Sequence, residues 1–156
     1  MKWTQLVKST RQVSPTSIRE AGSGGGVFDL DLSYEAGTKR MIFRGKVRGS
    51  NIPFYTWEVA FLNVEREDNL SQNELMQNMF PKPSLKNNDI QLRCSCPSFR
   101  FTFADPDRAV GAKTGANFPR QIRKTDRASR NPDQRPGSCK HLIEVVTYLA
   151  NNGFVA

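Results

Sequence analysis

The stretch "RCSCPSF" (residues 93–99) places two cysteines one residue apart and follows them with a proline. A second stretch, "GSCKHL" (residues 137–142), places a cysteine two residues before a histidine. The 156-residue chain contains three cysteines and one histidine, so these two short stretches hold all four residues. Because the two pairs hold every cysteine and the only histidine, they point to one shared site, although they lie far apart in the sequence.

The four residues have the chemistry of a structural zinc site, which takes four thiolate or imidazole ligands in a tetrahedron. Residues i and i+2 of a strand point to the same side, so Cys94 and Cys96 can approach one ion where a strand ends. Residues two apart on a helix do not face each other, so we expect Cys139 at a helix cap and His141 in the first turn. We therefore predict that Cys94, Cys96, Cys139 and His141 bind one structural zinc ion.

Other interpretations of the cysteines are weaker. Buried cysteines are common as small hydrophobic residues, and a Cys94–Cys96 disulfide would be strained and would leave the second pair unexplained. A catalytic zinc keeps an open coordination position and a nearby base. Here all four donors are used and no second histidine exists, so we expect a protein that is not an enzyme.

The segments around the ligands favour an α+β fold. "VFDLDLS" (27–33), "KRMIFRGKVRG" (39–49) and "IPFYTWEVAFLNVE" (52–65) have the alternation or the residue types of strands. The latter two are predicted to form an antiparallel hairpin, and "DIQLRC" (89–94) a further strand of a β-meander. A short helix is expected from Ser71 to about Met79, and "CKHLIEVVTYLANNG" (139–153) has the clearest helical spacing.

The rest of the chain is predicted to be less regular. Residues 1–26 are expected to be an extended N-terminal arm that ends in the glycine hinge "GSGGG" (22–26). Residues 27–92 form the β-rich region and 93–156 the zinc module. Within that module, 97–138 is expected to be a long, exposed, basic insertion loop. Phe99, Phe101 and Phe103 alternate as in a strand, and their aromatic side is expected to face the core, with a platform for base stacking as the alternative.

Positive charge gathers in this insertion. The net charge of the chain is +8, and residues 97–138 hold nine basic and four acidic residues. Such a surface favours an anionic partner, either phosphates of a nucleic acid or carboxylates of a protein, while a merely solvated surface is an equal alternative. The predicted contact residues are Trp3 of the arm and eight basic residues: Arg108, Lys113, Arg120, Arg123, Lys124, Arg127, Arg130 and Arg135.

The pattern of the ligands resembles the SWIM-type zinc finger over about residues 90–152. The match comprises Cys94, Cys96, Pro97, Phe99 and Cys139–Leu142. The resemblance implies a ββα zinc module that binds DNA or protein, although the 42-residue spacer between the pairs is longer than is usual in that family. A looser resemblance links the chain to small CxC/CxH proteins of large tailed bacteriophages.

Two functions follow as expectations. The first is a zinc-stabilised structural component that docks onto a larger assembly, such as a phage virion, through its arm and its arginine-rich loop. The second is a SWIM-like nucleic-acid-binding protein. The N-terminus lacks the apolar core of a signal peptide and no stretch has the ~20 apolar residues of a membrane span. We therefore expect a protein of the cytoplasm, or of the virion, with no membrane or small-molecule partner.

Overall fold

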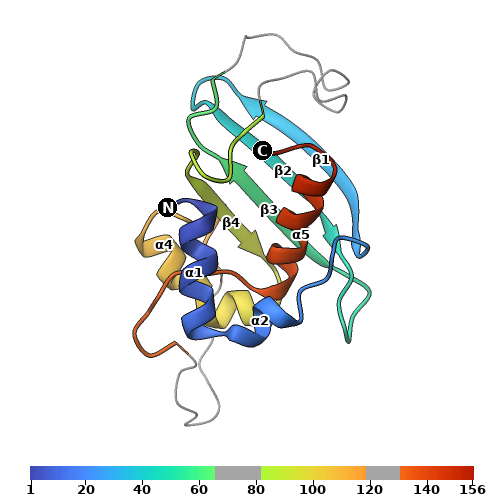
Figure 1. Cartoon of the computed structure of the whole chain (residues 1–156), viewed down its shortest axis with the longest axis vertical. Coiled ribbons are helices and arrows are strands. Elements are labelled where there is room, and N and C mark those ends of the chain that lie inside the picture. Colours follow the sequence, from blue (N-terminus) through green and yellow to red (C-terminus); the bar gives the residue numbers. More distant parts are fainter. Residues whose placement is uncertain (66–81, 119–130) are drawn as a thin grey trace.

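The computed structural model describes residues 1–65, 82–118 and 131–156. It has an α+β fold built on a four-stranded antiparallel sheet (Figure 1). The strands are β1 (Val27–Glu35), β2 (Arg40–Val47), β3 (Tyr55–Phe61) and β4 (Ile90–Cys94), and they lie side by side in chain order. The predicted meander, with its β2–β3 hairpin, is therefore confirmed.

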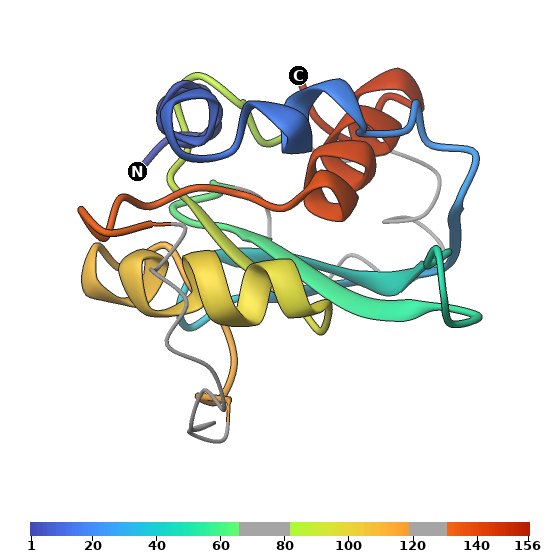
Figure 2. The same cartoon turned by 90° about the horizontal axis from the view of Figure 1, so that it is seen from below.

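Helices lie on both sides of this sheet (Figure 2). On one side are α1 (Trp3–Val13), α2 (Pro15–Arg19) and α5 (Lys140–Asn151). On the other side, near β4, lie the π-helical turn η1 (Phe99–Phe103) and α4 (Ala104–Ala109). The prediction of a C-terminal helix is confirmed by α5, which is followed by Gly153 at a φ of 75°. Within the described ranges, no helix is long and apolar enough to span a bilayer.

The side of the sheet that faces α5 forms the core. Alternate residues of β2, β3 and β4 point to it, because side chains of a strand alternate between the two faces. These buried residues are Met41, Phe43, Val47, Trp57, Val59, Phe61, Ile90, Leu92 and Cys94. Strand β1 follows the predicted alternation only in part. Leu32 is fully buried, but the register shifts between Phe28 and Asp31, and Phe28 is 36% exposed.

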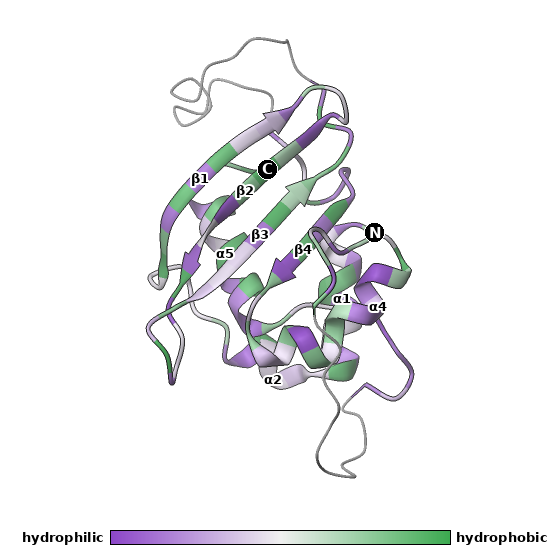
Figure 3. Cartoon of the chain, turned by 180° about the vertical axis from the view of Figure 1, so that it is seen from behind, coloured by the Kyte–Doolittle hydropathy of each residue, from purple (hydrophilic) through white to green (hydrophobic). Residues whose placement is uncertain are grey.

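Hydrophilic residues interrupt the hydrophobic ones along the strands (Figure 3), and the face opposite α5 carries a row of charges. Four charged residues lie opposite one another across all four strands, in the order Asp31, Arg44, Glu58 and Arg93. Their signs alternate, and the Nε atom of Arg44 lies 2.7 Å from a carboxylate oxygen of Glu58. Opposite charges in directly facing positions stabilise the pairing of neighbouring strands.

The expectation of an extended N-terminal arm is wrong. Residues 3–13 form α1, and Trp3 and Leu6 belong to the hydrophobic core, with exposures of 8% and 0%. The backbone of Met1 also accepts a hydrogen bond of 3.0 Å from the amide of Ile90. Trp3, Leu6 and Thr10 recur at helical spacing, which places all three on the buried face of α1. Trp3 therefore packs within its own chain and presents almost no surface to a neighbour.

The stretch "GSGGG" is a packing segment, which corrects the expectation of a hinge. The amide of Gly26 donates a hydrogen bond of 3.0 Å to Glu144 of α5. A Cβ atom on Gly24 would lie 3.0 Å from the Cβ of Tyr148, and Gly24 has a φ of 117°. Glycine is needed here because the backbone approaches α5 closely and adopts a conformation that other residues avoid.

The described part of the insertion, residues 97–118 and 131–138, is more regular than expected. Residues 99–109 are helical, and Lys113 pairs with Leu92 at the edge of β4. The alternation of phenylalanines therefore does not mark a strand. Phe99 and Phe103, four residues apart, are fully buried, while Phe101 is 45% exposed. The helix predicted from Ser71 to Met79 lies outside the described residues.

Candidate metal centre

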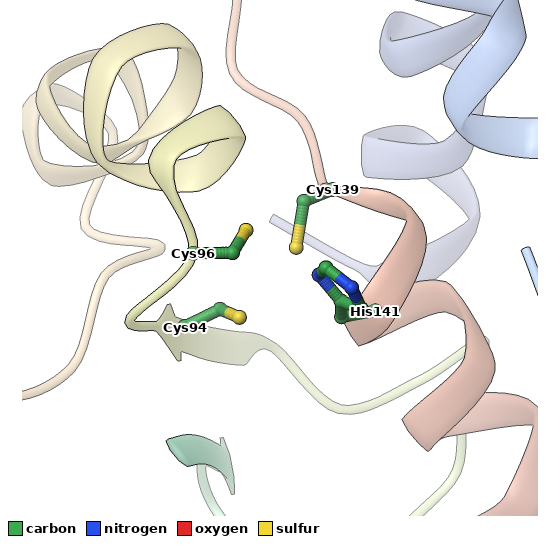
Figure 4. Close-up of side chains that lie close together, drawn as sticks. All are labelled: Cys94, Cys96, Cys139 and His141. Atoms are coloured by element: carbon green, nitrogen blue, oxygen red, sulfur yellow. The ribbon is translucent and has the colours of Figure 1, made fainter. Parts of the chain in front are cut away.

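The four predicted ligands come together at the junction of the sheet and α5. Cys94 is the last residue of β4, Cys139 is the N-cap of α5, and His141 lies in its first turn, as predicted. The four side chains point toward one another (Figure 4). Their ligand atoms all lie within 4.8 Å of one another, and all four residues are buried. Zinc bound by thiolates at about 2.3 Å requires separations a little below 4 Å, so these residues fit one metal ion.

The end of β4 presents the first pair. The amide of Ser95 donates to the carbonyl of Thr56 at 3.0 Å, which continues the β3–β4 pairing past Cys94. The amide of Phe99 then donates to the sulfur of Cys96 at 3.4 Å. An amide directed at a sulfur stabilises the thiolate form that binds metal ions.

The approach to Cys139 is fixed by two buried side chains. Oδ1 of Asp107 accepts a hydrogen bond of 2.7 Å from the amide of Gly137, and Oγ1 of Thr10 accepts one of 2.9 Å from Ser138. A Cβ atom on Gly137 would lie 2.5 Å from the ring of Phe103, so only glycine fits there. These residues belong to α1, α4 and the segment before α5, and together they position Cys139 for the site.

Sequence reasoning did not identify Thr10, Asp107 or Gly137 as part of this arrangement. Gly137, two residues before Cys139, was the available signal, since glycine often marks a close approach of the backbone. Thr10 and Asp107 both lie more than 30 residues before Cys139. Both also belong to segments that were predicted to be irregular, the arm and the insertion loop.

His141 has an incomplete set of hydrogen bonds. Its Nδ1 atom is buried and has no hydrogen-bond partner in the part of the chain that the structure describes. The ring packs against Tyr55 at a centroid distance of 4.9 Å. A buried polar atom without a partner is unfavourable. Coordination of a metal ion by the imidazole would explain why the ring is buried here.

The thiols influence one another strongly. Hydrogen bonds from Cys139 and Cys94 hold the pKa of Cys96 far below its ordinary value. Burial raises the pKa of Cys139, and neighbouring Cys94 and Cys96 raise it further. Three thiolates buried side by side would repel one another. A divalent cation would supply the opposite charge that permits several thiolates in this buried space.

The predicted contact residues are scattered. The Arg108 side chain is 54% exposed and lies 3.4 Å from Asp105. The ammonium of Lys113 donates to the carbonyl of Ala116 at 2.9 Å, and Arg135 contacts Gln12 and Asp133. The remaining five lie outside the described residues: Arg120, Arg123, Lys124, Arg127 and Arg130.

Comparisons with protein-family models, with curated proteins and with solved structures find no match for this chain. The resemblance to SWIM-type fingers therefore rests on the four ligands and the residues next to them. What the fold establishes directly is a buried cluster of three cysteines and one histidine that can hold one metal ion.

Proposed function

We propose that this protein is a non-enzymatic module that binds one structural zinc ion through Cys94, Cys96, Cys139 and His141. The observation that carries the proposal is the convergence of four buried ligand atoms within 4.8 Å of one another. Three thiolates and an imidazole suit zinc, and four protein ligands complete its tetrahedral shell without a position for water. The ion would fasten the first turn of α5 to the end of β4.

Metal content and coordination geometry test this proposal. We expect one zinc per chain by elemental analysis, and tetrahedral thiolate spectra when cobalt replaces zinc. His141→Ala should lower the zinc affinity at least tenfold. Lys140→Ala is the matched control, because Lys140 lies between the two ligands of α5 and its side chain is 34% exposed. A purified, folded protein that binds no zinc or cobalt would overturn the proposal.

We further propose that the module docks onto a larger protein assembly, with a phage virion as the setting implied by the looser resemblance. Since Trp3 packs in the core, it cannot be the anchor. An apolar patch supports it: Phe28, Ile52 and Phe54 are 36%, 44% and 38% exposed, and the two phenylalanine rings lie 6.1 Å apart. Sedimentation of the native protein in extracts of its source tests this, and migration as a free 17.6 kDa monomer would contradict it.

Nucleic-acid binding is the second candidate function. It is favoured by basic side chains that form no ion pair within the described ranges, among them Arg93, Arg100 and Lys113, which gather around one aromatic ring. Titration of a labelled oligonucleotide at two salt concentrations tests it, because release of counterions makes such binding steeply dependent on salt. Absence of binding at low salt would exclude this candidate and leave zinc binding unaffected.

A further inference from the structure

Three cations surround one aromatic ring on the side of the sheet opposite α5. The Cζ atoms of Arg93 and Arg100 lie 4.1 Å and 5.2 Å from the ring centroid of Phe118, and the Nζ atom of Lys113 lies 5.5 Å from it. These four residues, with the neighbouring Phe101, are called the Phe118 cluster below. They come from β4, from η1 and from the segment that follows α4 (Figure 2).

Arg93, Arg100 and Lys113 form no ion pair in the part of the chain described, although Glu58 faces Arg93 across the strands and Asp105 attracts Lys113 at longer range. Arg93 and Lys113 both donate to the carbonyl of Ala116, and Nε of Arg100 is buried without a partner. Burial and the nearby charges of Arg93 and Arg108 lower the pKa of Lys113, a sign that cations crowd one another here. Lys46 offers a contrast, since it lies 4.7 Å from the ring of Phe54 but is paired with Asp29 at 3.1 Å.

The cluster also presents an aromatic surface. Phe118 is held in place by an edge contact with the buried Phe99, at a centroid distance of 6.4 Å. Phe101 is 45% exposed, more than any other large hydrophobic residue described, and Arg100 lies 5.7 Å from its ring. An exposed ring beside unpaired cations matches the chemistry of single-stranded nucleic acids, whose bases stack on aromatic rings while their phosphates contact arginine and lysine.

We propose that the Phe118 cluster is a binding site for single-stranded nucleic acid, with a base stacked on Phe101 and the neighbouring phosphates held by Arg93, Arg100 and Lys113. This inference rests on the second candidate function and gives that function a location. Two of the cations, Arg93 and Arg100, were not among the contact residues predicted from the sequence. An acidic peptide would also pair its carboxylates with these cations, but it has no bases to stack on the exposed ring of Phe101.

Fluorescence anisotropy with a labelled oligothymidylate, on the zinc-loaded full chain, tests the site. Phe101→Ala should weaken binding roughly fivefold to a hundredfold, the range for loss of one stacked base. Phe54→Ala, which removes a ring of similar exposure (38%) from another cation–aromatic pair, should leave the affinity unchanged. Arg100→Gln should weaken binding and reduce the salt dependence by about one counterion. Arg44→Gln, which removes the same charge from an ion pair with Glu58, should have a smaller effect.

The outcomes separate the site from the function. Binding that Phe101→Ala and Arg100→Gln weaken no more than their controls would overturn the site but leave nucleic-acid binding standing. Absence of any binding at low salt would overturn both. Displacement of the oligonucleotide by poly-glutamate of equal charge at equal concentration would overturn the site as proposed, because it would assign the cluster to acidic peptides. Unchanged zinc content and circular dichroism show that each variant is folded.

Discussion

The two ends of α5 are attached to the sheet by different kinds of interaction. At its start, Cys139 and His141 meet Cys94 and Cys96 in a cluster of metal-binding side chains. Beyond its last turn, the ring of Phe154 packs edge-on against Phe43 at 6.0 Å, and Ala156 exchanges backbone hydrogen bonds with Pro83 and Leu85. One attachment uses polar ligands in a buried space, and the other uses apolar area and backbone pairing.

This difference implies different dependence on solution conditions. Thiolates and imidazole bind a metal ion only when deprotonated, so the first attachment depends on pH and on free metal. Burial of an aromatic ring depends on neither. The start of α5 should therefore respond to a chelator, while the end of α5 should remain packed as long as the sheet is folded.

Removal of the metal should produce the largest effect. Structural zinc contributes apparent binding free energies of about 10–16 kcal/mol in small zinc domains, which is comparable to the total stability of a typical domain. We expect a chelator to lower the melting temperature strongly. Hydrogen exchange should show that protection is lost first in residues 139–145 and later in 149–156. An unchanged melting temperature, with bound zinc removed, would contradict the role of the ion.

The buried Asp107 should give the next largest effect, through its dependence on pH. Burial raises its pKa to about 8, against the lowering effect of the hydrogen bond from Gly137. Between about pH 4 and pH 8, Asp107 is therefore protonated in the folded protein and ionised in the unfolded chain. The contribution of Asp107 to the free energy of unfolding is thus largest at low pH and declines as the pH rises toward 8.

Asp107→Asn isolates this contribution. Each pH unit corresponds to about 1.4 kcal/mol at most, so between pH 5 and pH 8 the wild type should lose up to about 4 kcal/mol that the variant keeps. Denaturant titrations of the zinc-saturated proteins measure the two slopes. Asp105→Asn is the control, because the side chain of Asp105 is 78% exposed. Parallel slopes for wild type and Asp107→Asn would show that this carboxyl is not protonated in the fold.

Truncation at the apolar end should have a moderate effect that is independent of zinc. Phe154 is 8% exposed, and replacing a buried phenylalanine by alanine typically lowers the unfolding free energy by about 3 kcal/mol. We expect Phe154→Ala to have the same effect at high and at limiting zinc, as measured in denaturant titrations. Phe28→Ala, at a ring that is 36% exposed, should change stability far less. A strong dependence of the Phe154→Ala effect on zinc would mean that the two ends act as one unit.

The smallest effect is expected between the two ends, where Gly24 meets Tyr148. Gly24→Ala adds a Cβ atom 3.0 Å from the Cβ of Tyr148 at a φ of 117°, and such strain costs about 1–3 kcal/mol. Gly25→Ala is the matched control, since its added Cβ atom would have no neighbour within 4 Å. Equal melting temperatures for the two variants would show that the close approach of this segment to α5 contributes nothing.

The sequence was sufficient to predict those features that short patterns encode. Two ligand pairs and a helical apolar spacing located the metal centre and α5, and the requirement for converging ligands placed Cys139 at the N-cap. The β2–β3 hairpin followed from β-branched and aromatic residues around a turn. These features depend on neighbours in the sequence, or on chemistry that allows few alternatives.

Features that depend on distant contacts were missed. Only Trp3, Leu6 and Thr10 of α1 are buried, and Trp3 and Leu6 hold one face of the helix in the hydrophobic core, a contact that the sequence of residues 1–21 does not reveal. The glycines of 22–26 were interpreted as flexible, since their contacts with Glu144 and Tyr148 are invisible without α5. The spacing of Phe99 and Phe103 fits both a strand and a helical turn, and only packing decides between them.

The position of Cys139 and His141 in the sequence affects the order in which the chain folds and binds its metal ion. Cys139 and His141 are translated after all four strands of the sheet. The apolar face of β2, β3 and β4 must therefore wait for its covering helix, and the ion cannot be captured at full affinity by a nascent chain that holds only Cys94 and Cys96. Contacts between residues so far apart in sequence form slowly, so we expect metal uptake to be a late step of folding.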